Sequence, residues 1–123
     1  MTRNKLEQMT VPHLIQRFTA IGMDQDRALL RGEHGKFNRL FDEMVTIEEE
    51  LKIRDGDQRK ELLDLYDHPN AQVRLNAVKA TLAVAPEQSL HMLKTIAKSR
   101  EYPQAGDAGM TLISLERGIF KPT

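Results

Sequence analysis

The sequence predicts an all-α protein of about six helices in one domain, and three observations support this. Strand signals are nearly absent, because only 5% of the residues are aromatic and no alternating run is bounded by turn dipeptides. Apolar residues instead recur three and four positions apart. Prolines begin three of the last four helical segments, and the short loops between them place successive helices side by side and antiparallel.

Composition limits the classes of function. The 123 residues include 18 basic and 18 acidic ones, and each half of the chain is balanced by itself. The basic surface that binds nucleic acid is therefore not expected. The chain has no cysteine, which excludes disulfides and thiolate metal sites. No signal peptide or membrane-spanning run is recognisable, so a cytoplasmic, bacterial-type protein is predicted.

Residues 10–54 are predicted to form an amino-terminal helical cap. Thr10 and Pro12 begin its first helix, because a hydroxyl caps free amides and proline is tolerated in the first turn. Gly22 is predicted to end this helix, since glycine commonly terminates helices. Asp24 is predicted to cap the next one.

The segment from Asp24 to Arg54 is predicted to be one long amphipathic helix, with Gly32 and Gly35 as the places where it bends or breaks. Its apolar residues stand one heptad apart, so this helix (24–54) is also a candidate seam for a homodimer. The glutamate run 48–50 is interpreted as a solvated face. The heptad positions are Leu30, Phe37, Met44 and Leu51, with Leu40 and Ile47 on the same face.

The rest of the chain is predicted to form two helical pairs, residues 57–85 and 86–119. Each helix start carries a side-chain oxygen or a proline in its first turn. The starts are Asp57, Pro69 with Asn70, Pro86, and Pro103 with Gln104; the ends are near Tyr66, before Pro86, and at Gly118.

The helix after Asn70 is predicted to be packed on two opposite sides. On a helical wheel its apolar residues fall into two opposed groups, and a helix of this kind must lie between two neighbours. One group is Val73, Ala77, Ala80 and Val84, and the other is Leu75, Val78 and Leu82.

The last helix repeats this layout 35 residues later, a period typical of helical repeats. Ala108, Leu112, Leu115 and Ile119 take the directions of the first group. Each of the two helices leaves one polar window for water, and together the windows form a shallow strip. Such a strip suits a protein or peptide better than a small molecule. The partner-binding candidates are Gln72, Asn76, Lys79, Asp107, Thr111 and Ser114.

The segment LLDLYDHPNAQVRLNAVKATLAVAPE resembles a HEAT repeat, with a first helix, a turn containing Asp67 and Pro69, and a Val-Arg pair before small residues. The stretches FNRLFDEM, HPNAQVRLNAVKATLAVAP and YPQAGDAGM resemble, in order and spacing, a small bacterial family known as a domain of unknown function, DUF2019. The resemblance covers residues 10–122. It implies an α-α superhelix of the HEAT/armadillo type, and it supplies no activity and no functional residues.

Arg74 is predicted to have a structural role. It lies between the two apolar faces of its helix, where a partly buried guanidinium needs an acceptor. Asp64 or Asp67, at the end of the preceding helix, is the expected partner, and Pro69 shapes the turn.

No catalytic, metal-binding or cofactor-binding residues are predicted. The stretch AGDAGM lacks the spacing of a phosphate loop, so Gly106 and Gly109 are interpreted as allowing close helix approach or a tight first turn. The four histidines have no zinc-binding spacing, and the serines at helical positions form no triad.

The leading hypothesis is a non-enzymatic module that binds a protein or peptide through the polar strip. One version is an immunity-type protein that neutralises a toxin. A second hypothesis is a nucleic-acid-binding or base-excision-related protein, because HEAT-like folds occur there, although the strip lacks excess positive charge. An accessory role related to chromophore lyases is the weakest alternative.

Overall fold

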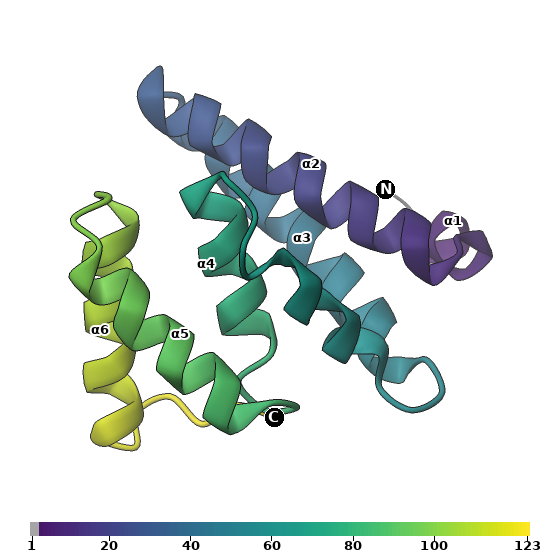
Figure 1. Cartoon of the computed structure of the whole chain (residues 1–123). Helices are drawn as coiled ribbons and strands as arrows, with labels where there is room; N and C mark the ends of the chain where they lie inside the picture. Colours follow the sequence, from purple (N-terminus) through teal and green to yellow (C-terminus); the bar gives the residue numbers. More distant parts are fainter. Residues whose placement is uncertain (1–2) are drawn as a thin grey trace.

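The computed structural model describes residues 3–123, and this part of the chain is helical, without strands (Figure 1). The long helices α2 and α3 pack against each other, α4 lies in the middle, and α5 and α6 form a pair on the far side. The elements are α1 (Arg3–Gln8), α2 (Val11–Leu30), α3 (His34–Ile53), a 3₁₀ helix η1 (Gln58–Leu65), α4 (Ala71–Ala80), α5 (Pro86–Lys98) and α6 (Gln104–Glu116). No helix in residues 3–123 combines the length and apolar character that crossing a bilayer requires.

Two of the predicted helix starts, at Thr10 and Asn70, are confirmed by capping contacts. Thr10 Oγ1 accepts a hydrogen bond from the backbone N–H of His13 at 3.2 Å and begins α2. Asn70 Oδ1 accepts from the amides of Gln72 and Val73, at 2.9 and 3.2 Å, and begins α4. These bonds satisfy amides that have no partner inside the helix. The segment after Asp57 is helical as predicted, but it is a 3₁₀ helix.

The predicted end of the first helix at Gly22 is wrong, because α2 continues without interruption to Leu30. Gly22 is buried in the middle of α2, against Val73 of α4. A glycine that stops a helix and one that lets two helices approach look alike in sequence. Asp24 is likewise inside α2, where it pairs with Arg27 instead of capping a new helix.

The predicted long helix 24–54 is two helices, α2 and α3, joined by a short turn. The break occurs at Gly32, whose φ of +67° is the left-handed conformation that favours glycine. Leu30, at the end of α2, is 82% exposed. Four of the heptad and adjacent positions in α3 are buried inside the molecule, where they belong to its own core. These are Leu40, Met44, Ile47 and Leu51.

The predicted packing of α4 on two sides is confirmed. Val73, Ala77 and Ala80 belong to a core that α4 shares with α1, α2, α3 and η1. Leu75 and Val78 belong to a second core shared with α5 and α6. The helix ends at Ala80, so Val84 lies beyond it. α4 is therefore the element that joins the two halves of the molecule.

Three of the four residues that were predicted to form the apolar face of the last helix do so, and the fourth does not. Ala108, Leu112 and Leu115 pack against the second core. Ile119 follows the end of α6 and is exposed. The expectation of close helix approach at Gly109 is also wrong, because a Cβ there would meet no atom within 4 Å.

The first helix, α1, was not predicted. Its position is held by Arg54, which donates hydrogen bonds to the carbonyl oxygens of Leu6 and Met9 at 2.9 and 2.8 Å. The same guanidinium pairs with Glu50 at 2.6 Å. Glu50 is buried, so the expected solvated face does not include this residue.

Candidate functional site: a groove bounded by α3, α4 and α6

The six predicted partner-binding residues line adjoining cavities between α3, α4 and α6. Three cavities meet at Phe120, and together we call them the tail groove. The outer cavity, of about 850 Å³, is lined by Lys79, Asp107, Thr111 and Ser114. The inner cavity, of about 230 Å³, is lined by Gln72, Asn76, Lys79 and Asp107. The six residues therefore line two cavities that share Lys79 and Asp107.

The expectation that this strip faces water is wrong for half of its members. Gln72 and Asn76 are each only 6% exposed, and Thr111 is 8% exposed. Their polar groups are satisfied inside the protein, since Thr111 Oγ1 donates to the carbonyl oxygen of Asp107 at 2.9 Å. Asp107 is exposed and Lys79 is half-buried, and the two form an ion pair at 3.0 Å. Ser114 is half-buried.

The buried amides form a row that connects three helices. Asn76 Nδ2 donates to Gln25 Oε1 in α2 at 2.7 Å, and Gln72 Nε2 donates to Asn76 Oδ1 at 2.9 Å. Gln104 Nε2 in α6 donates to Gln72 Oε1 at 3.0 Å. We call these four residues the amide row. Each bond satisfies groups whose burial would otherwise be costly.

Gln25 and Gln104 are the members that sequence reasoning missed. Gln25 interrupts the apolar stripe of α2, where the four other stripe positions are buried apolar residues. A polar residue in such a stripe indicates a buried hydrogen-bonded group. The stripe positions are Leu14, Phe18, Ile21 and Ala28.

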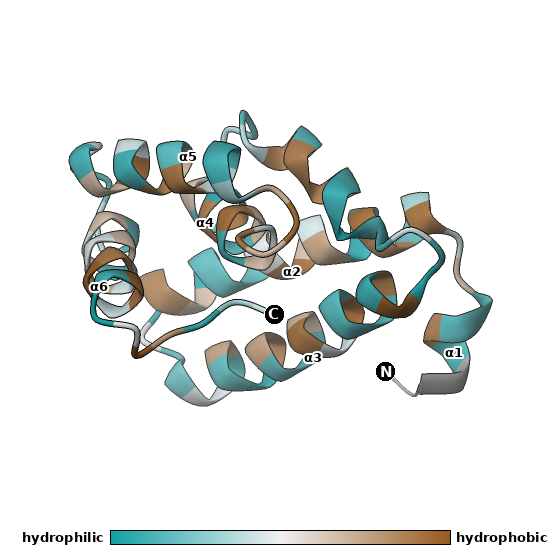
Figure 2. Cartoon of the chain, turned by 90° about the horizontal axis from the view of Figure 1, so that it is seen from below, coloured by the Kyte–Doolittle hydropathy of each residue, from teal (hydrophilic) through white to brown (hydrophobic). Residues whose placement is uncertain are grey.

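The chain after α6, residues 117–123, which we call the tail, passes from the end of α6 into the space between α4 and α3 (Figure 2). The amides of Ile119 and Phe120 donate to the carbonyl oxygen of Ser114 at 2.9 and 3.2 Å. Arg59 Nη2 donates to the carbonyl oxygen of Thr123 at 3.4 Å. Phe120 lines all three cavities and is still 38% exposed. The tail therefore occupies the groove without filling it.

Glu48 lies on the α3 wall of the groove, where it lines the inner cavity and the neighbouring cavity of about 320 Å³ around the tail. Among the described residues its carboxylate has no hydrogen-bond or ion-pair partner. Burial raises the pKa of Glu48 above its ordinary value, although the positive charge of Arg59 acts in the opposite direction. Glu48, like Glu50, departs from the expected solvated face.

Arg59 lies at the far end of the groove, and its charge is held by Asp57. Arg59 Nε and Nη2 donate to the two carboxylate oxygens of Asp57 at 2.9 and 2.7 Å. These hydrogen bonds lower the pKa of Asp57. The guanidinium is thus fixed in place beside the tail.

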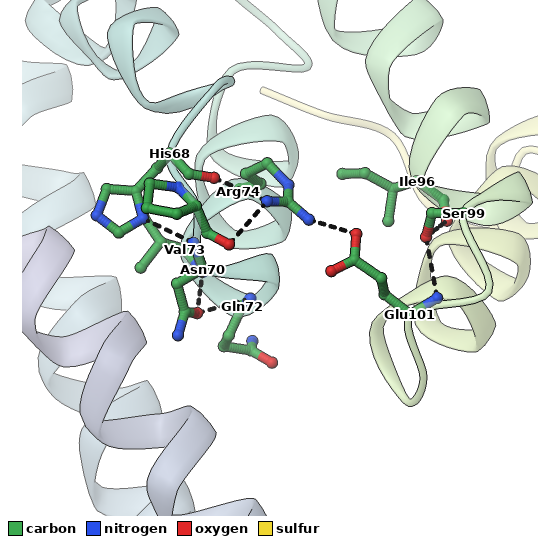
Figure 3. A network of polar contacts seen from close by, with 9 residues as sticks. His68, Asn70, Gln72, Val73, Arg74, Ile96, Ser99 and Glu101 are labelled. Carbon is green, nitrogen blue, oxygen red and sulfur yellow. Dashed lines mark hydrogen bonds and ion pairs between the residues drawn. The ribbon is translucent and has the colours of Figure 1, made fainter.

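Arg74 lies outside the groove and joins the two helical pairs (Figure 3). Its Nη1 donates to the carbonyl oxygens of His68 and Pro69 at 2.8 and 3.1 Å, and its Nη2 pairs with Glu101. The side chain is partly buried, as predicted, but its acceptors are not Asp64 or Asp67. The carbonyls of the turn and a carboxylate after α5 satisfy it instead.

Metal-ligating groups do not converge in the described part of the chain. No three His, Asp or Glu side chains of residues 3–123 lie where they could hold a metal ion together.

Comparisons with known proteins confirm the resemblance to DUF2019. A family model described as a domain of unknown function (DUF2019) matches residues 12–116. The crystal structure of protein RPA1889 from Rhodopseudomonas palustris CGA009 is similar, with 52% sequence identity and a TM-score of 0.93. The match covers 96% of this chain and 98% of that one. No curated protein sequence matches the chain significantly.

Proposed function

Because this chain belongs to the DUF2019 family, whose function is not known, its geometry is the guide to its role, and we propose that it is a cytoplasmic protein-interaction module with HEAT-like repeats. The proposed binding site is the tail groove. Contact between α4 and α6, which stand at equivalent positions of the two helical pairs, supports the repeat interpretation.

The proposed occupant is an extended segment of another protein that carries an aromatic anchor residue. The observation that supports this is the position of Phe120, which lies at the junction of three cavities. The chain's own tail is an irregular segment with an aromatic side chain, and the groove has space left beside it. A segment with a larger contact area would displace the tail.

The rim of the outer cavity has the composition of an interaction surface. Tyr102 and Met110 are each 71% exposed, and both line this cavity. Exposed apolar side chains grouped beside polar ones are typical of protein-binding sites. Asp107 neutralises Lys79, so the outer cavity offers no excess of positive charge for a phosphate backbone.

A labelled peptide with the tail sequence RGIFKPT tests the proposal by fluorescence anisotropy. The full chain with Phe120→Ala vacates its own anchor position, and Phe120 belongs to neither core, so folding should persist. We expect this variant to bind RGIFKPT in trans and to bind RGIAKPT at least about tenfold more weakly, because an aromatic anchor dominates such contacts. The wild-type chain should bind RGIFKPT more weakly than the variant, since its own tail competes.

The matched control is Ile53→Ala, which removes an exposed apolar side chain at the end of α3. It should bind RGIFKPT no better than the wild type. Equal binding of RGIFKPT and RGIAKPT by the Phe120→Ala variant would show that the groove does not select an aromatic anchor. A wild-type dimer in sedimentation that Phe120→Ala dissolves would assign the groove to a second copy and contradict the proposed partner.

A further inference from the structure

The inner cavity differs from the rest of the tail groove because it combines aromatic walls with buried polar groups. Phe37 and Phe41 of α3 line it, and Phe120 lines it from the tail. Gln25 and Asn76 of the amide row also line it. With a volume of about 230 Å³, it has room for a small ring compound and not for a folded segment.

Gln25 provides a hydrogen-bond donor that the protein leaves unused. Its Oε1 accepts from Asn76 at 2.7 Å. The Asn76 amide thereby sets the orientation of the Gln25 amide, because turning Gln25 alone would bring two NH₂ groups together. Its Nε2 is buried and has no partner within residues 3–123. A buried donor without an acceptor is rare in native proteins and needs a partner.

Glu48 provides an acceptor in the same cavity, on the α3 wall. Its carboxylate has no partner among the described residues, as noted above, whereas the neighbouring Lys79 and Asp107 satisfy each other. Two of the residues that line this cavity therefore carry a polar group without a hydrogen-bond partner in residues 3–123, a donor on Gln25 and an acceptor on Glu48.

From this combination we infer that the inner cavity is a binding site for a small, uncharged aromatic compound that carries both a carbonyl oxygen and an N–H group, such as an aromatic carboxamide. The carbonyl oxygen accepts from Gln25 Nε2, and the N–H group donates to Glu48. The ring packs against Phe37 and Phe41, beneath Phe120. This site goes beyond the proposed binding of a protein segment, and it does not need a partner.

Three probes of nearly equal shape test the assignment on the wild-type chain. Benzamide has the acceptor and the donor, acetophenone keeps only the acceptor, and benzoate replaces the donor with negative charge. Titrations followed by ¹H–¹⁵N NMR should show saturable shifts of the Gln25 side-chain amide with benzamide, at about millimolar affinity for a ligand of this size. Acetophenone should bind more weakly, and benzoate most weakly.

Two variants separate the roles of the polar groups. Gln25→Leu should weaken benzamide binding about fivefold, the value of one hydrogen bond. Glu48→Gln, on the partly exposed wall, should raise the affinity for benzoate relative to benzamide by about fivefold, because it removes a like charge. If Gln25→Leu fails to fold, Glu48→Gln alone tests whether the polar groups of the cavity contribute to binding.

The inference is overturned if benzamide causes no saturable shift, which would leave water as the partner of Gln25. It is equally overturned if the three probes bind alike, or if Glu48→Gln does not raise the affinity for benzoate relative to benzamide. Either result would show that the cavity is merely apolar.

Discussion

Gly22 of α2 faces Val73 of α4 so closely that a Cβ on Gly22 would lie 2.8 Å from Val73 Cγ2. We therefore predict that Gly22→Ala destabilises the protein, although alanine is the better helix former by about 1 kcal/mol. Overpacking against Val73 should lower the free energy of unfolding by about 1–3 kcal/mol. Urea denaturation measures the change.

Gly109→Ala is the matched control, since Gly109 also lies inside a helix and its Cβ would meet no atom within 4 Å. It should stabilise the protein by about 0.5–1 kcal/mol. If the two variants changed stability in the same direction, the close contact at Gly22 would not be real.

The turn between α2 and α3 gives a second prediction. Gly32→Ala forces a side chain into the left-handed conformation at φ +67°, which should cost about 1–2 kcal/mol. Gly35→Ala, inside α3, carries no such penalty and should be neutral or stabilising. Melting temperatures of the two variants compare them directly, and an unaffected Gly32→Ala would contradict a left-handed residue in this turn.

The contacts of Arg74 predict a loss of stability when the side chain is removed. Arg74→Ala leaves the carbonyls of His68 and Pro69 without their donor and breaks the pair with Glu101. The free energy of unfolding should fall by about 1–3 kcal/mol. Lys94→Ala, exposed on α5, should change it by less than about 0.5 kcal/mol. An unchanged melting temperature for Arg74→Ala would remove its structural role.

The raised pKa of Glu48 predicts a dependence of stability on pH. The folded state binds the proton of Glu48 more tightly than the unfolded state, in which the pKa is near 4.5. The stability that this group contributes is therefore lost as the pH rises from about 4.5 through the higher pKa of the folded state. Glu48→Gln should therefore be more stable than the wild type at pH 7, and the difference should disappear well below pH 4.5. Glu49→Gln, on the exposed side of α3, is the control. Equal differences at both pH values would mean that Glu48 is not desolvated.

Helix starts and fold class could be predicted because their signals are local. The Asn70 cap and the proline at the start of α5 act on amides one to three residues away. The two apolar faces of α4 were also predictable, because a helix of known direction shows its buried sides on a wheel. The family resemblance is confirmed by the family model.

Features that depend on contacts between distant segments could not be predicted. Gly22 was taken for a helix end because its neighbour Val73 lies on another helix. The strip residues Gln72 and Asn76 were expected in water because their amide partners, Gln25 and Gln104, come from α2 and α6. The position of Phe120 depends on a tail that has no regular structure and hence no periodic signal.

α4 belongs to both cores at once, and this limits how the molecule can be divided or deformed. A truncation on either side of α4 would expose Val73 or Val78 to solvent. We therefore expect insoluble fragments and not a smaller folded protein. α4 also lines the inner cavity, and we expect this helix to be the part of the groove that deforms least. Adjustment to an incoming molecule would fall to the tail and to side chains at the rim, while the backbone beneath them stays still.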